Sequence, residues 1–296
     1  MARASDTTIQ QALSWGTATL TSALPENDAS ALDARVLLAS ALQRSVTYLY
    51  TWPDKAIGST ELHRYQRYIA QRGQGTPVAY ITGQRDFWSL SLQVSPATLI
   101  PRPDTETLVE QALLRLPTGP ATICDLGTGT GAVALAIASE RPDCQILAID
   151  VVAEAVELAS SNAQANNLTN VTVLQSSWFA NIQGQQFDML VSNPPYVENL
   201  SPYLKQGDVR FEPASALTAG SDGLDDIRYI VQHAGNYLTA QGWLLLEHGY
   251  TQGPAVRTLL QEAGFIEVST VNDLSGQPRI SGGQWCAKGQ VVCRSQ

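Results

Sequence analysis

The sequence has few residues of the kinds that bind metals or form disulfide frameworks. Its 296 residues include 4 Cys and 3 His. Cys124, Cys144, Cys286 and Cys293 show no C-x-x-C spacing, so we expect reduced thiols and no bound metal. No apolar run approaches the roughly 18 to 20 residues that span a bilayer, and residues 1–7 form no apolar signal segment. We therefore expect a cytoplasmic protein with no membrane partner.

Positive charge is also scarce. Lys and Arg number 18 against 27 Asp and Glu, which gives a formal net charge of −9. Binding to DNA or RNA depends on clustered Lys and Arg that neutralise phosphates, so this composition disfavours a nucleic acid partner. An acidic protein instead attracts partners with basic surfaces. Hydrophobic residues make up 44% of the chain, as in an ordinary globular protein, and the length allows two domains.

Hydrophobic periodicity divides the chain into three parts. Residues 1–75 carry apolar residues at helical spacing and are predicted to form a small helical domain. Residues 76–103 form a linker in which the alternation after Trp88 indicates part of a β-hairpin. From 104 to 296, helix and strand signals alternate, which predicts an α/β domain with a doubly wound, mainly parallel sheet. The expected helices are 104–115, 131–139, 153–166, 224–238 and 251–263, and the expected strands are 122–125, 146–149, 171–175, 187–192, 242–247 and 265–270.

A glycine-rich turn follows the first strand of the α/β part. From Asp125 to Gly131 the sequence reads Asp-Leu-Gly-Thr-Gly-Thr-Gly, and such glycines let a ligand approach the backbone closely. The spacing differs from the Gly-x-Gly-x-x-Gly of dinucleotide sites and lacks the Gly-Lys-Ser/Thr ending of a P-loop. Asp150 ends the next strand, 19 residues after Gly131, where a carboxylate can accept hydrogen bonds from both hydroxyls of a ribose.

Together, the turn and the aspartate predict a nucleoside cofactor without a phosphate chain, which fits S-adenosylmethionine. Taken alone, each signal also has a structural explanation, because short glycine turns serve helix–strand packing and an aspartate after a strand often caps the next helix. The candidate cofactor-binding residues in this region are Asp125, Gly127, Thr128, Gly129, Thr130, Gly131 and Asp150.

The most informative motif is Asn193-Pro194-Pro195-Tyr196, directly after the expected strand 187–192. The prolines have no N–H and hold a stiff backbone whose carbonyls point outward instead of into a sheet. With the Asn193 side chain, these carbonyls make a group of hydrogen-bond acceptors beside an aromatic ring. Such a group suits a planar –NH2, which predicts methylation of an amide or exocyclic amine nitrogen. The alternative is that the prolines only terminate the strand.

These three motifs resemble those of class I methyltransferases that act on planar nitrogens. Further segments narrow the resemblance to the HemK/PrmC family, the glutamine N5-methyltransferases of peptide chain release factors. The segments that carry it are 76–83, 99–106, 206–213 and 244–249. Of these, the Pro-Arg-Pro-x-Thr-Glu element at 101–106 is more specific than the Asn-Pro-Pro-Tyr tetrapeptide.

The resemblance implies a Rossmann-like class I methyltransferase domain and a small all-helical N-terminal domain, joined by the β-hairpin, in which the helical domain binds the protein substrate. It implies methyl transfer from S-adenosylmethionine, leaving S-adenosylhomocysteine, to the N5 amide nitrogen of the glutamine in the Gly-Gly-Gln motif of class 1 release factors. Asn193 and Pro194 would hold and activate that amide, and Pro195 and Tyr196 would complete the substrate site. Asn193 would also contact the cofactor, and Trp178 occupies a position that flanks the adenine.

The chain departs from the family pattern at Ser177, where an Asp is common, which leaves the contact to the adenine amino group unassigned. Arg102 and Glu106 have no assigned role, and three interpretations stay open: a structural pair, charges at the start of a helix, and a role in the active site. The tripeptide at 282–284 copies the substrate motif Gly-Gly-Gln, and we interpret it as coincidence. Two other functions stay open: a nucleic acid methyltransferase acting on adenine N6 or guanine N2, and a nucleoside-sensing protein without turnover.

Overall fold

The computed structural model describes residues 7–286, which divide into two compact units. The first unit contains the described residues up to Gln84 and, in addition, the distant segment Lys205–Phe211. The second unit contains Arg85–Leu204 and the described residues from Glu212 onward. Cys293 lies outside the described residues. Within them, every helix is too short or too polar to cross a bilayer.

The first unit is built from helices around one core. Thr8 begins α1 with a capping box, in which its hydroxyl accepts from the Gln11 N–H while the Gln11 side chain accepts from the Thr8 N–H. The core is formed by apolar side chains at helical spacing, including Leu37, Leu38 and Ile69, all at most 1% exposed. The helices of this unit are α1 (Ile9–Ala23), α2 (Ser30–Leu42), α3 (Val46–Thr51), α4 (Ser59–Gly73) and α5 (Val78–Thr82).

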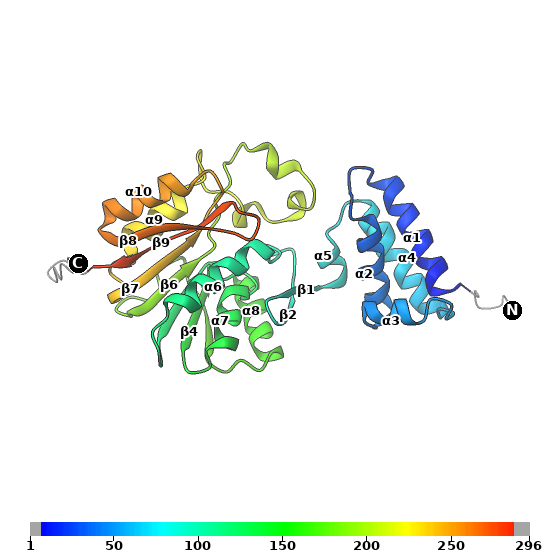
Figure 1. Ribbon diagram of the computed structural model, residues 1–296, viewed down its shortest axis with the longest axis horizontal. Helices are drawn as coiled ribbons and strands as arrows, with labels where there is room; N and C mark the ends of the chain where they lie inside the picture. The colour runs from blue at the N-terminus through cyan, green and yellow to red at the C-terminus, as the bar shows by residue number, and fades with distance from the viewer. Residues whose placement is uncertain (1–6, 287–296) are drawn as a thin grey trace. The chain divides into compact units, whose positions relative to one another are not determined.

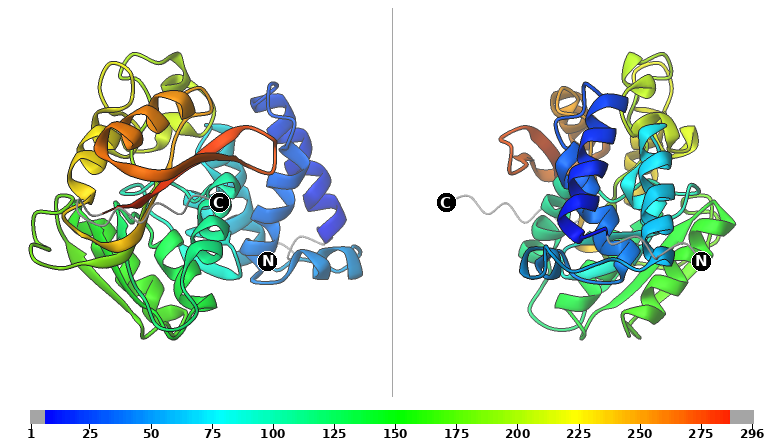
Figure 2. Two further views of the ribbon diagram at one scale, coloured as in Figure 1. Left: turned by 60° about the vertical axis from the view of Figure 1, so that its left-hand side comes forward. Right: turned by 90° about the vertical axis from the view of Figure 1, so that its right-hand side faces the viewer.

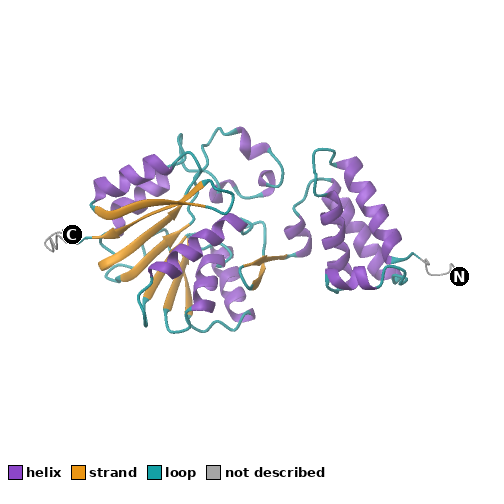
Figure 3. Ribbon diagram, in the orientation of Figure 1, coloured by secondary structure: helices purple, strands orange, loops and turns teal. Residues whose placement is uncertain are grey.

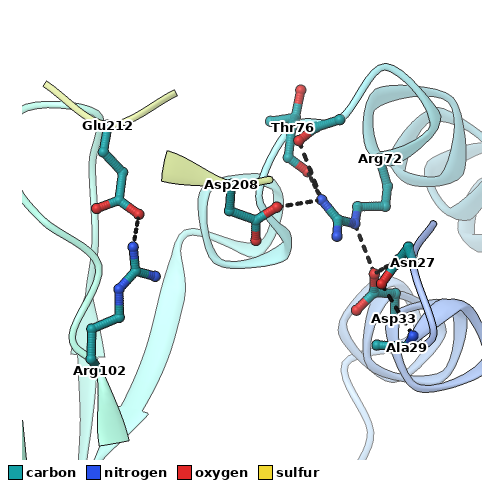
Figure 4. A network of polar contacts seen from close by, with 9 residues as sticks. Asn27, Ala29, Asp33, Arg72, Thr76, Arg102, Asp208 and Glu212 are labelled. Carbon is teal, nitrogen blue, oxygen red and sulfur yellow. Dashed lines mark hydrogen bonds and ion pairs between the residues drawn. The ribbon is translucent and has the colours of Figure 1, made fainter. Parts of the chain in front are cut away.

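An ion-pair network within this unit holds the segment Lys205–Phe211 (Figure 4). Arg72 of α4 donates from Nε to Asp33 and from Nη1 to Asp208, both at 2.8 Å. The side-chain amide of Asn27 donates to the same Asp33 oxygen at 2.9 Å. Because Arg72 is buried, its charge requires these carboxylates, and Asp208 thereby fastens a segment more than 100 residues downstream.

A short hairpin and a seven-stranded sheet make up the strands of the described chain. The hairpin, β1 (Gln84–Phe87) and β2 (Leu90–Gln93), is the one expected between the helical and α/β parts. The large sheet has the order β5-β4-β3-β6-β7-β9-β8, parallel from β5 to β7 and antiparallel around β9. This confirms the expected doubly wound, mainly parallel sheet. Its strands are β3 (Thr122–Leu126), β4 (Gln145–Asp150), β5 (Val171–Gln175), β6 (Phe187–Ser192), β7 (Leu238–Glu247), β8 (Phe265–Asn272) and β9 (Pro278–Trp285).

Helices cover both faces of the large sheet (Figures 1 and 2). Helices α6, α7 and α8 pack on one face and α9 and α10 on the other, so the strands lie between two helical layers (Figure 3). Side chains along β3 alternate between the two faces of the sheet, so Ile123 packs in the core under α6 and α7 and Cys124 in the core under α9 and α10. Because both faces are buried, the central strands are nearly continuous apolar runs. These helices are α6 (Glu106–Arg115), α7 (Ala132–Glu140), α8 (Ala153–Ala165), α9 (Asp225–Ala234) and α10 (Gly253–Ala263).

Strand β9 was not expected from the sequence, although it lies inside the sheet between β7 and β8. It contains Gly282 and Gly283, which are usually turn residues. In the fold, a Cβ on Gly282 would lie 2.7 Å from the Leu244 carbonyl oxygen, so the glycine is needed where two backbones approach closely. The Gly-Gly-Gln tripeptide at 282–284 is therefore part of the sheet, where its first glycine has a structural role.

Candidate functional site

A pocket opens at the carboxyl edge of the sheet, within the second unit. Parallel strands β3, β4, β5 and β6 end there, and ligands bind at this edge in open α/β sheets. Most of the residues singled out in the sequence line it. Gly131, Pro194 and Tyr196 are not part of its lining among the described residues. The lining includes Asp125, Gly127, Thr128, Gly129, Thr130, Asp150, Trp178, Asn193 and Pro195, together with Thr105, Ser177 and Asp226.

Asp125 organises the glycine-rich turn from its buried position at the end of β3. One of its carboxylate oxygens accepts from the Thr128 hydroxyl at 2.6 Å and from the Ala134 N–H at 3.2 Å. Burial raises the pKa of Asp125 to about 6, and these two hydrogen bonds act in the opposite direction. The carboxylate thus ties the turn to the first residues of α7.

Gly127 and Trp178 lie next to each other in the pocket wall. Gly127 has φ +74°, and a Cβ there would lie 3.4 Å from the Trp178 ring. Trp178 itself has φ +46°, a left-handed conformation that bulky residues rarely adopt. Held backbone strain of this kind is common at ligand sites. The Trp178 indole therefore lies on the glycine turn, as a residue flanking a flat ring would.

Asp150 ends β4 and links two parts of the pocket wall. One carboxylate oxygen accepts from the Gly129 N–H and the other from the Val152 N–H, each at 2.9 Å. Each oxygen keeps a further lone pair, so the group can still accept from a pair of hydroxyls. The bond to Val152 is local, and the capping role that the sequence left as an alternative is wrong, because Val152 is the N-cap of α8 and the helix has no side-chain capping bond.

The pocket wall also contains a carboxylate that was not predicted from the sequence. Asp226, in the first turn of α9, lines the pocket and accepts a hydrogen bond from the Trp178 side chain. Burial and the neighbouring Asp225 raise the pKa of Asp226. The Ser176 hydroxyl is already engaged, since it donates to the Trp178 carbonyl and accepts from the Asn181 N–H.

Asn193 presents its side-chain oxygen freely because its nitrogen is held. The Asn193 Nδ2 donates to Thr105 Oγ1 at 3.2 Å. Among the described residues, neither Asn193 Oδ1 nor the Pro194 carbonyl oxygen has a hydrogen-bond partner. The strand end before them is fixed by Ser192, whose hydroxyl donates to the Leu126 carbonyl at 2.6 Å. The acceptor group predicted from the sequence is therefore available.

Tyr196 fixes the far end of the motif instead of lining the pocket. Its carbonyl accepts from the Gln252 side-chain amide at 3.0 Å, and its hydroxyl donates to Glu247 Oε1 at 3.3 Å. Burial of the phenol raises the pKa of Tyr196, as does the nearby Glu247 charge. Glu247 ends β7 and is 1% exposed. Burial raises its pKa to about 7, although contact with Thr105 and the charge of Arg279 lower it.

Arg102 and Glu106 belong to separate contacts and do not form a pair with each other among the described residues. Arg102 forms an ion pair with the buried Glu212, which lies after the acceptor motif (Figure 4). Glu106 accepts from the Trp88 N–H at 2.9 Å and so secures the turn of the β1–β2 hairpin. The two contacts join segments that are 110 and 18 positions apart in the sequence.

Three residues of the site were not predicted from the sequence: Thr105, Glu247 and Asp226. Thr105 lies in the Pro-Arg-Pro-x-Thr-Glu element, which was identified only by resemblance. Glu247 had a usable signal, because a charged residue that ends an apolar strand lies at the carboxyl edge of a parallel sheet. Asp226 had none, since an acidic residue in the first turn of a helix is ordinary.

Family models match both units of the chain. The model of the PrmC N-terminal domain matches residues 11–83, and the model of the methyltransferase small domain matches residues 105–212. Among solved structures, a methyltransferase from Pyrococcus furiosus aligns with a TM-score of 0.51 and 19% identity, over 74% of this chain and 98% of that one. A 16S rRNA N2 G1207 methyltransferase of T. Thermophilus, solved with AdoMet and guanosine, gives the same TM-score and identity over 68% of this chain and 49% of its own. At these identities the likeness establishes the fold alone.

Curated relatives are much more similar. The release factor glutamine methyltransferase of Pseudomonas aeruginosa is 54% identical over 264 residues, which covers 89% of this chain and 96% of the relative. The Escherichia coli protein of the same name is 48% identical over 89% of this chain and 95% of its own length. These matches confirm the resemblance seen in the sequence. The chain is therefore a methyltransferase and belongs to the release factor glutamine methyltransferase family.

Proposed function

We propose that this enzyme transfers a methyl group from S-adenosylmethionine to the N5 amide nitrogen of the glutamine in the Gly-Gly-Gln motif of class 1 release factors. The names of its relatives support the substrate, and we place the reaction in the cytoplasm, where translation terminates. The observation that carries the proposal is the pair of free acceptors, Asn193 Oδ1 and the Pro194 carbonyl, beside the pocket. The helical unit would hold the protein substrate.

The acceptor pair suits an amide better than most nucleophiles. The lone pair of an amide nitrogen is delocalised into its carbonyl, so the nitrogen attacks poorly while it stays planar. Two oxygens that accept from its two N–H groups orient the nitrogen and favour pyramidalisation, during which positive charge grows on it. Because that charge is larger in the transition state than in the ground state, fixed acceptor dipoles lower the barrier.

The residues of the pocket fit the proposed cofactor. Asp150 would accept from the ribose hydroxyls, and Trp178 would flank the adenine. At Gly129, a Cβ would meet nothing closer than 3.9 Å, so the turn leaves room beside its backbone for the methionine part. The chemistry that S-adenosylmethionine supplies when bound is an electrophilic methyl group on sulfur. The residues named here include no general base, and we propose that the amide proton leaves to water after transfer.

Charge separates this proposal from methylation of adenine N6 or guanine N2, which the same acceptors could serve. Nine of the 18 basic residues but 20 of the 27 acidic residues belong to the second unit, which carries the pocket. A nucleic acid would bring phosphates to this acidic surface, which opposes binding. A substrate loop on a basic protein would not meet that repulsion.

The test is a methyl-transfer assay with labelled S-adenosylmethionine and an unmodified release factor. A factor carrying Gln→Ala in its Gly-Gly-Gln motif is the control, and total RNA and DNA are assayed alongside. We expect label in the wild-type factor alone, on the glutamine by mass spectrometry, and loss of it in the Asn193→Ala enzyme. Label confined to nucleic acid would refute the proposal, and cofactor binding without any transfer would indicate a sensor.

A further inference from the structure

Glu247 is a buried carboxyl group that the proposed chemistry does not use. It is 1% exposed, and its Oε2 has no hydrogen-bond partner among the described residues. Buried polar atoms are nearly always paired, so an unpaired carboxylate oxygen requires an explanation. Removal of the charge would relieve this unfavourable burial. The position of this carboxyl group beside the acceptor motif indicates a role there.

A chain of polar contacts joins Glu247 to the acceptor motif at two points. Tyr196 donates its hydroxyl proton to Glu247 Oε1 at 3.3 Å. The Thr105 hydroxyl also contacts the carboxyl group and favours its ionised form. On its other side, Thr105 Oγ1 accepts from Asn193 Nδ2 at 3.2 Å. Thr105 is 4% exposed, so water does not compete for these contacts.

The direction of this chain follows from what each group can donate. An ionised carboxylate only accepts, so the protons of both hydroxyls point toward Glu247. The Thr105 oxygen then has only lone pairs to offer Asn193, which must turn its –NH2 toward Thr105. We infer that Glu247, given the proposed function, is a positioning residue whose carboxylate acts through Thr105 to present Oδ1 of Asn193, and not its –NH2, to the substrate amide. A flipped Asn193 would set a donor against the donor N–H of the substrate.

The charges around Glu247 make this orientation of the Asn193 amide dependent on pH. Arg279 from β9 favours the ionised form, whereas Asp104 beside α6 and the burial itself favour the protonated form. The resulting pKa of about 7 lies in the working range of an enzyme. A protonated Glu247 can donate to Thr105, whose own proton then turns toward Asn193 and favours the flipped amide. Activity should therefore fall as the pH is lowered through 7.

The kinetic test uses three substitutions of matched shape. In Glu247→Gln the new –NH2 donates to Thr105 and mimics the protonated state. In Thr105→Val the link is removed, and in Thr105→Ser it is kept. We expect kcat to fall about 10- to 100-fold in the first two, as for a misplaced reacting group, with a smaller change in KM for S-adenosylmethionine. In both variants the fall in activity near pH 7 should disappear, whereas Thr105→Ser should retain it.

A measurement without substrate keeps this test separate from the proposed function. With 15N-labelled asparagine, the Asn193 side-chain amide signal is identified by its absence in Asn193→Ala. It should shift with a midpoint near pH 7 in the wild type and not in Glu247→Gln or Thr105→Val. The inference would be overturned if Glu247→Gln had the pH profile and kcat of the wild type. It would also be overturned if the Asn193 signal shifted with pH in Glu247→Gln as it does in the wild type. Failure to label release factors would instead refute only the proposed substrate.

Discussion

Replacing Glu247 with Gln should stabilise the protein at alkaline pH. The substitution keeps the shape of the side chain and its hydrogen bond from Tyr196 but removes a charge that is buried at 1% exposure. The pKa of Glu247 is raised from 4.5 to about 7, so the folded state holds this proton more tightly than the unfolded state does. Stability from the protonated form is therefore complete below pH 4.5 and is lost as the pH rises toward 7.

The size of the effect follows from the two pKa values. The pKa of Glu247 is 4.5 in the unfolded state and about 7 in the folded state, and at 1.36 kcal/mol for each pKa unit this difference corresponds to about 3 kcal/mol of stability. The Gln variant should thus exceed the wild type in free energy of unfolding by about 1 kcal/mol at pH 5.5 and about 3 kcal/mol at pH 8.5. Asp125, whose pKa is also raised, titrates equally in both proteins and cancels from the comparison.

Urea denaturation followed by tryptophan fluorescence at the two pH values measures this difference. Glu262→Gln, which removes an exposed carboxylate from α10, is the control and should change little at either pH. A Glu247→Gln advantage that is the same at both pH values would show that titration of Glu247 is not the cause. A variant less stable than the wild type at pH 8.5 would refute the reasoning altogether.

Three further substitutions test other parts of the structure. Gly131→Ala should lower the free energy of unfolding by about 1–3 kcal/mol, measured in urea, because φ is +85° and the new Cβ would lie 3.1 Å from a side chain of α7. Gly119→Ala, with φ +105° in open space, is the control and should lower it less. Equal losses would show that close packing at Gly131 does not contribute. Asp150→Asn should weaken S-adenosylhomocysteine binding about tenfold or more by calorimetry, and an unchanged Kd would contradict ribose binding there. Arg72→Met should lower the free energy of unfolding by about 3–5 kcal/mol, and adding Asp33→Asn should restore part of it; no restoration would contradict the buried pair.

Much of the second unit could be predicted from the sequence because its signals are local. Strands 171–175 and 187–192 have the expected bounds, since most of their residues are apolar and polar residues flank each of them. Helix α9 ends at Ala234 instead of residue 238, and β7 begins at Leu238 instead of 242. The observed strand continues through Gln241, which has φ +68°, a left-handed conformation that is unusual inside a strand. Tertiary pairing overrode the local preference.

The parts that could not be predicted depend on contacts between residues distant in sequence. Thr105 joins Asn193 across 88 positions, and Tyr196 joins Glu247 across 51. No periodicity records such pairs. The acceptor motif itself was visible because its chemistry lies in four consecutive residues, whereas the groups that orient it are scattered over β7 and the start of α6.

The discontinuous helical unit has a consequence for synthesis of the chain. Helices α1 to α5 are complete by residue 82, yet Asp208, a partner of the buried Arg72, is translated more than 100 residues later. A nascent chain that has emerged only as far as β1 therefore holds this guanidinium with one of its two carboxylates. Closing the long loop to Asp208 also costs conformational entropy, and a domain made of one continuous segment would not have this cost. The helical unit should thus reach its final stability on the ribosome only after most of the sheet has been synthesised.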